Sequence, residues 1–156
     1  MYHYILCHAG RILCRVYLQP RVRKAISFSL LDMFKRVDDL RSYESTNLAQ
    51  LTGALLARGT VPLATLQHAG DLERAAEPYC SPKIAGFWRL VMSTVLRACP
   101  SDHALWADTA GTPPVVRARL AEVLQRHVEP WAREEGRTGD EVVAREVGGK
   151  LQGRGT

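Results

Sequence analysis

The sequence predicts an all-α protein made of stacked antiparallel helix pairs, with about seven helices. Apolar residues recur with the helical period along almost all of the 156 residues, and no stretch alternates with the period of a strand. Proline and glycine stand where helices are expected to begin and end. The segments between the expected helices are short, which favours antiparallel neighbours.

The first two helices are expected over residues 2–17 and 25–40, on either side of Pro20. Proline predicts a break there because it has no backbone N–H with which to continue a helix. Phe28 falls at a position expected in the core, and the second helix is expected to end at Asp38 and Asp39. The rest of its apolar face is formed by Ile26, Leu30, Met33, Phe34 and Val37.

The third helix is expected to begin with Ser42 as its N-cap and to end before Gly59, a residue that tolerates the left-handed conformation of a helix terminus. A short fourth helix is expected over residues 62–69, with Pro62 in its first turn. The apolar stripe of the third helix is Leu48, Leu51 and Leu55, with Leu56 beside it.

Two strong start signals, Ser81-Pro82 and Thr112-Pro113, predict the fifth and seventh helices. The fifth is expected to end before Pro100, and a short sixth helix follows with Leu105 and Trp106. The seventh runs to Trp131 and carries His127 on its apolar stripe, where a hydrogen-bonded core or boundary histidine is expected.

The domain is expected to span residues 1–134 and to be followed by a flexible tail over residues 135–156. This last segment has six glycines, balanced charge and few large side chains, a composition that supports little packing.

The net charge of +5 is concentrated in the first third of the chain. Residues 1–58 hold nine Lys or Arg against four Asp or Glu, whereas the remainder is balanced. Such a surface attracts phosphate backbones or acidic partner proteins, although it can also be an ordinary solvated face. Base stacking is not expected beside it, because Phe28 is assigned to the core. The candidate RNA- or partner-binding residues are Arg21, Arg23, Lys24, Lys35, Arg36 and Arg41.

No motif in the sequence indicates a catalytic, cofactor-binding or metal site, so an enzyme is not expected. It contains no Gly-rich phosphate loop, no His-Glu-x-x-His motif and no Gly-x-Ser-x-Gly elbow. The four cysteines form no Cys-x-x-Cys pair and are interpreted as reduced thiols. A metal site that joins Cys7 and Cys14 to His3 or His8 is the alternative. No apolar run is long enough to span a membrane.

Several motifs between Leu13 and Leu66 resemble those of the MI domain, also written MA-3. A Leu-Cys pair at 13–14 precedes a basic linker, Phe-Ser-Leu-Leu-Asp occupies 28–32, Asn-Leu-Ala-Gln-Leu occupies 47–51, and a short Leu-rich helix follows at 63–66. The resemblance extends more generally over residues 1–131. The family's tryptophan is Leu31 here, and a histidine common in its third helix is replaced by Gly53-Ala54.

The closest resemblance is to the MI domain of nucleolar proteins that also carry an upstream middle domain of initiation factor four-gamma. It implies a stack of helical hairpins like HEAT repeats, without the family's upstream region. It also implies an adaptor role in small-subunit pre-ribosomal RNA processing, with a DEAD-box RNA helicase or other pre-ribosomal proteins as partners and a nucleolar location. The alternatives are direct RNA binding through residues 21–41, or an MI-type regulator of translation or splicing.

Overall fold

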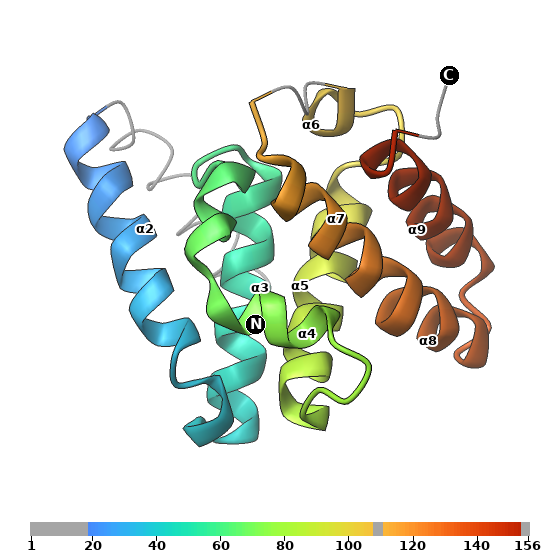
Figure 1. Cartoon of the computed structure of the whole chain (residues 1–156), viewed down its shortest axis with the longest axis horizontal. Helices are drawn as coiled ribbons and strands as arrows, with labels where there is room; N and C mark the ends of the chain where they lie inside the picture. Colours follow the sequence, from blue (N-terminus) through green and yellow to red (C-terminus); the bar gives the residue numbers. More distant parts are fainter. Residues whose placement is uncertain (1–18, 108–110, 154–156) are drawn as a thin grey trace, which may run out of the picture.

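The structure, a computed structural model, describes residues 19–107 and 111–153, and these form helices without any strand (Figure 1). The predicted all-α class is therefore confirmed. The helix expected over residues 2–17 lies outside the described residues, and so do His3, Cys7, His8 and Cys14.

Helices α2 (Pro20–Phe34) and α3 (Ser42–Ala57) run antiparallel, with the single 3-10 turn η1 (Val37–Asp39) between them (Figure 1). Helix α2 begins at Pro20, before the start predicted at residue 25, because the fixed φ of proline suits a first helical turn. The predicted N-cap at Ser42 is wrong by one residue. Arg41 occupies that position, and its N–H donates to the Glu44 carboxylate over 2.8 Å.

The next segment holds the 3-10 helix η2 (Leu63–His68), the short α4 (Gly70–Ala76) and the long α5 (Pro82–Ala98). The predicted fourth helix is thus a 3-10 helix, and α4 was not expected. The start predicted for α5 is confirmed, since the Ser81 hydroxyl accepts a hydrogen bond from the Lys83 N–H.

The short α6 (Ala104–Ala107) precedes one long helical run, made of α7 (Pro114–Val123), the π-helical η3 (Leu124–Val128) and α8 (Glu129–Glu134). Pro130 lacks a backbone N–H, and the wider π turn lies immediately before it. His127 is satisfied as predicted: its Nε2 lies 2.8 Å from the carbonyl oxygen of Ala75.

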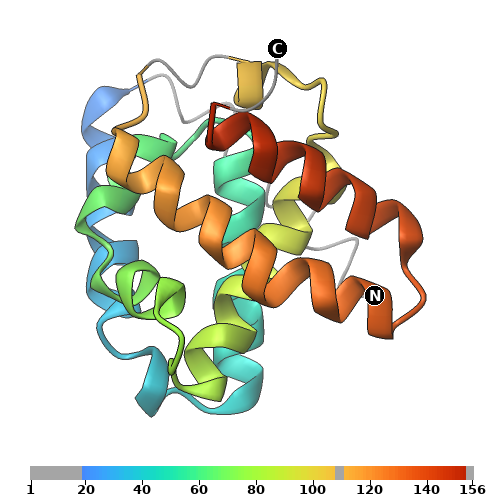
Figure 2. The same cartoon turned by 45° about the vertical axis from the view of Figure 1, so that its right-hand side comes forward.

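The prediction of a flexible tail is wrong for residues 138–151, which form helix α9 (Thr138–Leu151). This helix returns alongside α7 and α8, as Figures 1 and 2 show. Its glycines are spread among Ala144, Val147 and Leu151, which are buried in the core. Burial of that stripe compensates for the low helix propensity of glycine.

The centre of the core lies where α2, α3 and α5 meet. Trp88 is fully buried and its ring lies 5.5 Å from each of the rings of Phe34 and Phe87. Helices α3 and α5 run in the same direction, as neighbours from successive hairpins do in a helical stack. They approach so closely at Gly53 that a side chain added there would meet Thr94.

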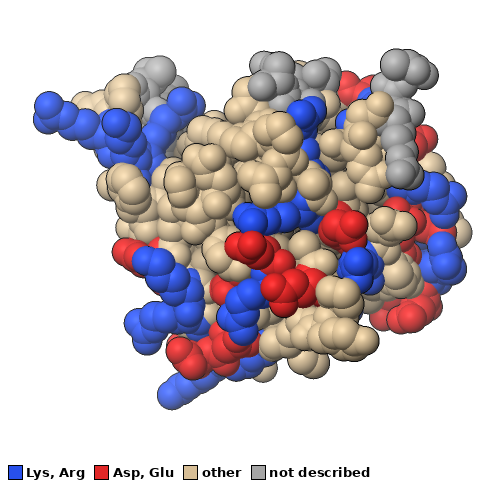
Figure 3. All heavy atoms as spheres, viewed as in Figure 1, with Lys and Arg blue, Asp and Glu red and all other residues tan. Residues whose placement is uncertain are grey.

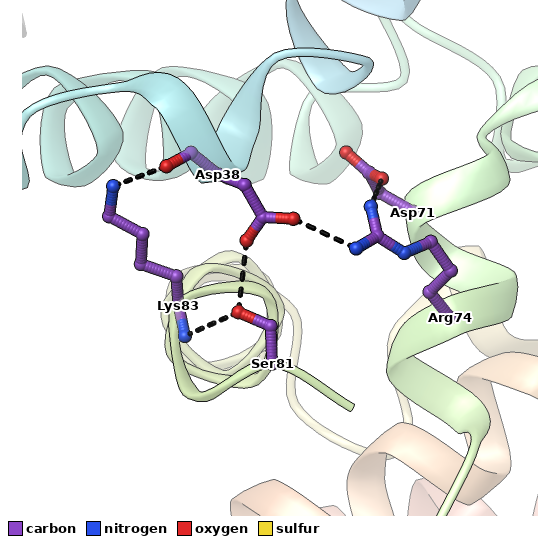
Figure 4. A network of polar contacts seen from close by, with 5 residues as sticks. All are labelled: Asp38, Asp71, Arg74, Ser81 and Lys83. Carbon is purple, nitrogen blue, oxygen red and sulfur yellow. Dashed lines mark hydrogen bonds and ion pairs between the residues drawn. The ribbon is translucent and has the colours of Figure 1, made fainter. Parts of the chain in front are cut away.

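One polar network joins the turn η1 to α4 and to the start of α5 (Figure 4). The Asp38 carboxylate accepts hydrogen bonds from Arg74 over 2.8 Å and from Ser81 over 2.9 Å, and the Asp38 carbonyl accepts one from the Lys83 ammonium. Arg74 also pairs with the buried Asp71. Burial raises the pKa of Asp71, whereas for Asp38 the bonds and charges of Ser81, Arg74 and Lys83 outweigh burial and lower the pKa.

Replacing Asp38 by alanine is expected to lower the free energy of unfolding at pH 7 by about 1–2 kcal/mol, because a partly exposed ion pair and a hydrogen bond are lost. The folded-state pKa of Asp38 lies below its ordinary value, so its contribution is lost as the pH falls through that folded-state pKa. Urea denaturation of both proteins at pH 7 and below pH 3 measures the difference. Asp39→Ala, at an exposed neighbour, is the control. A difference that persists in acid would contradict this interpretation.

Candidate binding surfaces

The six predicted basic residues are all exposed, but they do not form one surface. Arg21, Arg23 and Lys24 lie in the first turn and a half of α2, whereas Lys35 and the remaining two follow its last residue. With a rise of about 1.5 Å per residue, the helix places these groups roughly 20 Å apart. Figure 3 shows the two groups of basic side chains at the two ends of α2, with largely uncharged surface between them and acidic surface beside the lower group. The prediction of a single patch is therefore wrong.

The exposed face of α2 also carries an aromatic side chain that the sequence assigned to the core. Phe28 is 65% exposed, and Met33, likewise expected in the core, is 44% exposed. Helical spacing puts Phe28 on the same outward side as Lys24 and Lys35, opposite the buried Leu30 and Phe34. Lys35 is paired with the Asp32 carboxylate over 2.8 Å, so Lys24 is the cation on this side of α2 without that neutralisation. An exposed aromatic ring beside a cation is a combination that stacks on bases and pairs with phosphates.

A second surface, not predicted from the sequence, is an open groove of 410 Å³ between α3, α5 and α8. We call it the α3–α5 groove. Its apolar part comes from Pro82, Phe87 and Leu90 of α5. Because its walls come from three helices that are distant in the sequence, no local motif could have indicated it.

Two cations line the α3–α5 groove, and no acidic residue does. The guanidinium of Arg89 lies over the ring of Trp131, 5.4 Å from its centre, and Arg137 lies over the same ring at 5.0 Å. Such cation–π contacts fix the orientation of a guanidinium without neutralising it. The ammonium of Lys83 is held by the Asp38 carbonyl. Within the described residues neither Lys83 nor Arg89 forms an ion pair with a carboxylate, so both keep their charge for a ligand.

Hydroxyl groups complete the α3–α5 groove. The hydroxyls of Thr46 and Ser93 donate to helical carbonyl oxygens of Ser42 and Arg89. The side chains of Ser42 and Ser45 also line the groove, from the first turn of α3. A hydroxyl can donate a hydrogen bond to an anionic oxygen. The hydroxyls of Ser42 and Ser45 can therefore add to the donors that Lys83 and Arg89 provide.

Other reactive groups of the described chain are engaged in structural contacts. The Cys99 thiol donates to the Ala57 carbonyl oxygen over 3.4 Å, and burial raises its pKa. Among the described residues no three side chains of His, Cys, Asp or Glu come together as a metal site needs. None of the helices in the described ranges is both long and apolar enough to cross a membrane.

The chain matches no family model, no curated protein and no solved structure. The geometry of the α3–α5 groove and of the face of α2 must therefore carry the functional argument together with the sequence motifs.

Proposed function

We propose that this chain is a non-catalytic adaptor that binds a partner protein in nucleolar ribosome biogenesis, in association with a DEAD-box RNA helicase. The motifs between Leu13 and Leu66 support the choice of process and partner. The α3–α5 groove supports the binding role. A stack of helices offers broad grooves between its members, and such surfaces recognise extended segments of other proteins.

The observation that carries the binding role is the charge of this groove. Two cations, Lys83 and Arg89, line it without a carboxylate partner in the described part of the chain. The Trp131 ring and the carbonyl oxygen of Asp38 hold Arg89 and Lys83 in place before a partner arrives. Preorganised charged groups lose little entropy on binding, so they favour recognition of an anionic surface.

Proximity labelling with the full chain in cells tests the proposed process. We expect the labelled proteins to be enriched in small-subunit pre-ribosomal RNA processing factors and in a DEAD-box helicase, and the label to concentrate in the nucleolus. If the label were spread over unrelated cytoplasmic proteins, with neither processing factors nor a DEAD-box helicase enriched, the assignment to ribosome biogenesis would be wrong.

A second candidate function, direct binding of single-stranded RNA, is favoured by the exposed Phe28 on α2. Its ring lies on the same side of the helix as Lys24, so a base could stack on the ring while a flanking phosphate meets that ammonium. This candidate uses a surface separate from the α3–α5 groove, which allows the two to be tested independently.

On this second candidate, Phe28→Ala is expected to weaken the binding of a single-stranded RNA oligonucleotide by about 5-fold to 100-fold, the range for the loss of one stacked base. Lys24→Glu should weaken it further and flatten its dependence on salt. Fluorescence anisotropy at several salt concentrations measures both. Tyr79→Ala removes an aromatic ring that is 97% exposed, in the segment between α4 and α5, and should change nothing. Equal effects of Phe28→Ala and Tyr79→Ala would count against stacking on α2.

A further inference from the structure

The α3–α5 groove offers three kinds of contact to a ligand. It has an apolar part, two preorganised cations and the hydroxyls of Ser42 and Ser45. We propose that it binds an extended acidic peptide segment of a partner protein, with carboxylate side chains on Lys83 and Arg89 and an apolar side chain against Pro82 and Leu90. This inference rests on the proposed adaptor function and names the chemistry of the segment that the adaptor recognises.

Charge complementarity selects an acidic occupant. The lining contains no Asp or Glu. Asp38, the carboxylate nearest to Lys83 in Figure 4, is already bound by Arg74 and Ser81. Burial raises the pKa of Asp38, but these bonds and the charges of Arg74 and Lys83 lower it more. A guanidinium presents its N–H groups as a planar fork that matches a carboxylate, and the Trp131 ring already holds the Arg89 fork in one orientation.

The shape of the groove favours a peptide. It runs along α3 and α5 from the exposed Ser42 and Pro82 at one end to the buried Ser93 at the other, and does not enclose a ligand. Its apolar residues lie beside the cations, so a segment that alternates acidic and apolar side chains can use both. Residues 1–18 of the chain itself carry two arginines and no acidic residue, so they do not complement these cations.

Trp131 provides a direct reporter. It lines the groove, whereas Trp88 and Trp106 are buried in the core. A peptide that displaces water from the groove should shift the emission of Trp131. The probe is a ten-residue peptide in which glutamate alternates with leucine and glycine, titrated into the full chain. The comparison peptides carry glutamine or phosphoserine in place of glutamate, which separates carboxylate from phosphate recognition.

We expect the glutamate peptide to bind and the glutamine peptide to bind at least ten-fold more weakly. Lys83→Gln and Arg89→Gln should each weaken binding about ten-fold, the loss typical of a charge-assisted hydrogen bond. Arg58→Gln is the matched control, because Arg58 is an exposed arginine that caps the opposite end of α3. Circular dichroism of each variant establishes that it is folded.

Three results would overturn the inference. The first is equal affinity of the glutamate and glutamine peptides, and the second is equal affinity of Arg89→Gln, Lys83→Gln and Arg58→Gln. The third is saturable binding of single-stranded RNA, but of no peptide, that depends on these two residues. The proposed adaptor function fails separately, if the peptide binds in the groove while proximity labelling enriches no pre-ribosomal protein. Conversely, if pre-ribosomal proteins are enriched but no peptide binds, the adaptor function remains supported and the α3–α5 groove is rejected as the peptide-binding site.

Discussion

Trp88→Ala is expected to lower the free energy of unfolding by about 3–5 kcal/mol, the largest effect of any single substitution considered for this protein. Trp88 is fully buried between two helices, and its ring contacts those of Phe34 and Phe87. Alanine would leave a cavity where α2, α3 and α5 meet, and the edge contacts between the aromatic rings would be lost as well.

Trp88→Phe separates the loss of volume from the loss of a polar group. The indole N–H of Trp88 is buried and has no hydrogen-bond partner among the described residues, so its removal costs no hydrogen bond. Phenylalanine fills most of the space, and the destabilisation should be clearly smaller than for alanine. Urea denaturation followed by circular dichroism measures both. If Trp88→Ala cost no more than Trp88→Phe, the aromatic cluster would not be the centre of the core.

The second large effect is expected at Gly53, where α3 and α5 are closest. A Cβ atom added there would lie 2.6 Å from the Cβ of Thr94 and 2.8 Å from the carbonyl oxygen of Val91. Replacing glycine by alanine inside a helix ordinarily stabilises it by about 1 kcal/mol. At Gly53 the backbone of α5 cannot move aside cheaply, so we expect a net destabilisation of about 1–3 kcal/mol.

Gly148→Ala is the matched control for Gly53→Ala. Gly148 is also buried in a helix, but an added Cβ would meet nothing within 4 Å. Alanine there should raise the free energy of unfolding by about 0.5–1 kcal/mol. The two substitutions are thus predicted to have opposite signs in the same thermal or urea denaturation experiment. A stabilising Gly53→Ala would mean that α3 and α5 are not in close contact at this position.

Local sequence signals predict much of the fold. The Ser81-Pro82 signal and the apolar positions that follow it predict α5 closely, and Gly59 ends the third helix with a φ of +64°. Helix α9 was missed because its glycines indicated flexibility. The spacing of its buried residues, at 144, 147, 148 and 151, was the signal that could have found it.

The candidate surfaces were less predictable, for a physical reason in each case. Basic residues that are close in the sequence were assumed to be close in space, but a rigid helix separates Lys24 from Lys35. Phe28 was assigned to the core by its position in the predicted helix, although its helical phase opposes Leu30 and Phe34. The α3–α5 groove brings Ser42, Arg89 and Trp131 together from three helices, and that proximity exists only in the folded chain.

We propose that this chain works as an adaptor that holds its partner in the α3–α5 groove. Capture of proteins from nucleolar extract by the immobilised full chain, quantified for wild type, Arg58→Gln and the Lys83→Gln/Arg89→Gln double variant, tests it most directly. We predict that wild type and Arg58→Gln capture a DEAD-box helicase or small-subunit processing factors to the same extent, and that the folded double variant captures at least ten-fold less. Equal capture by all three proteins, or capture of neither class by wild type, would contradict the claim.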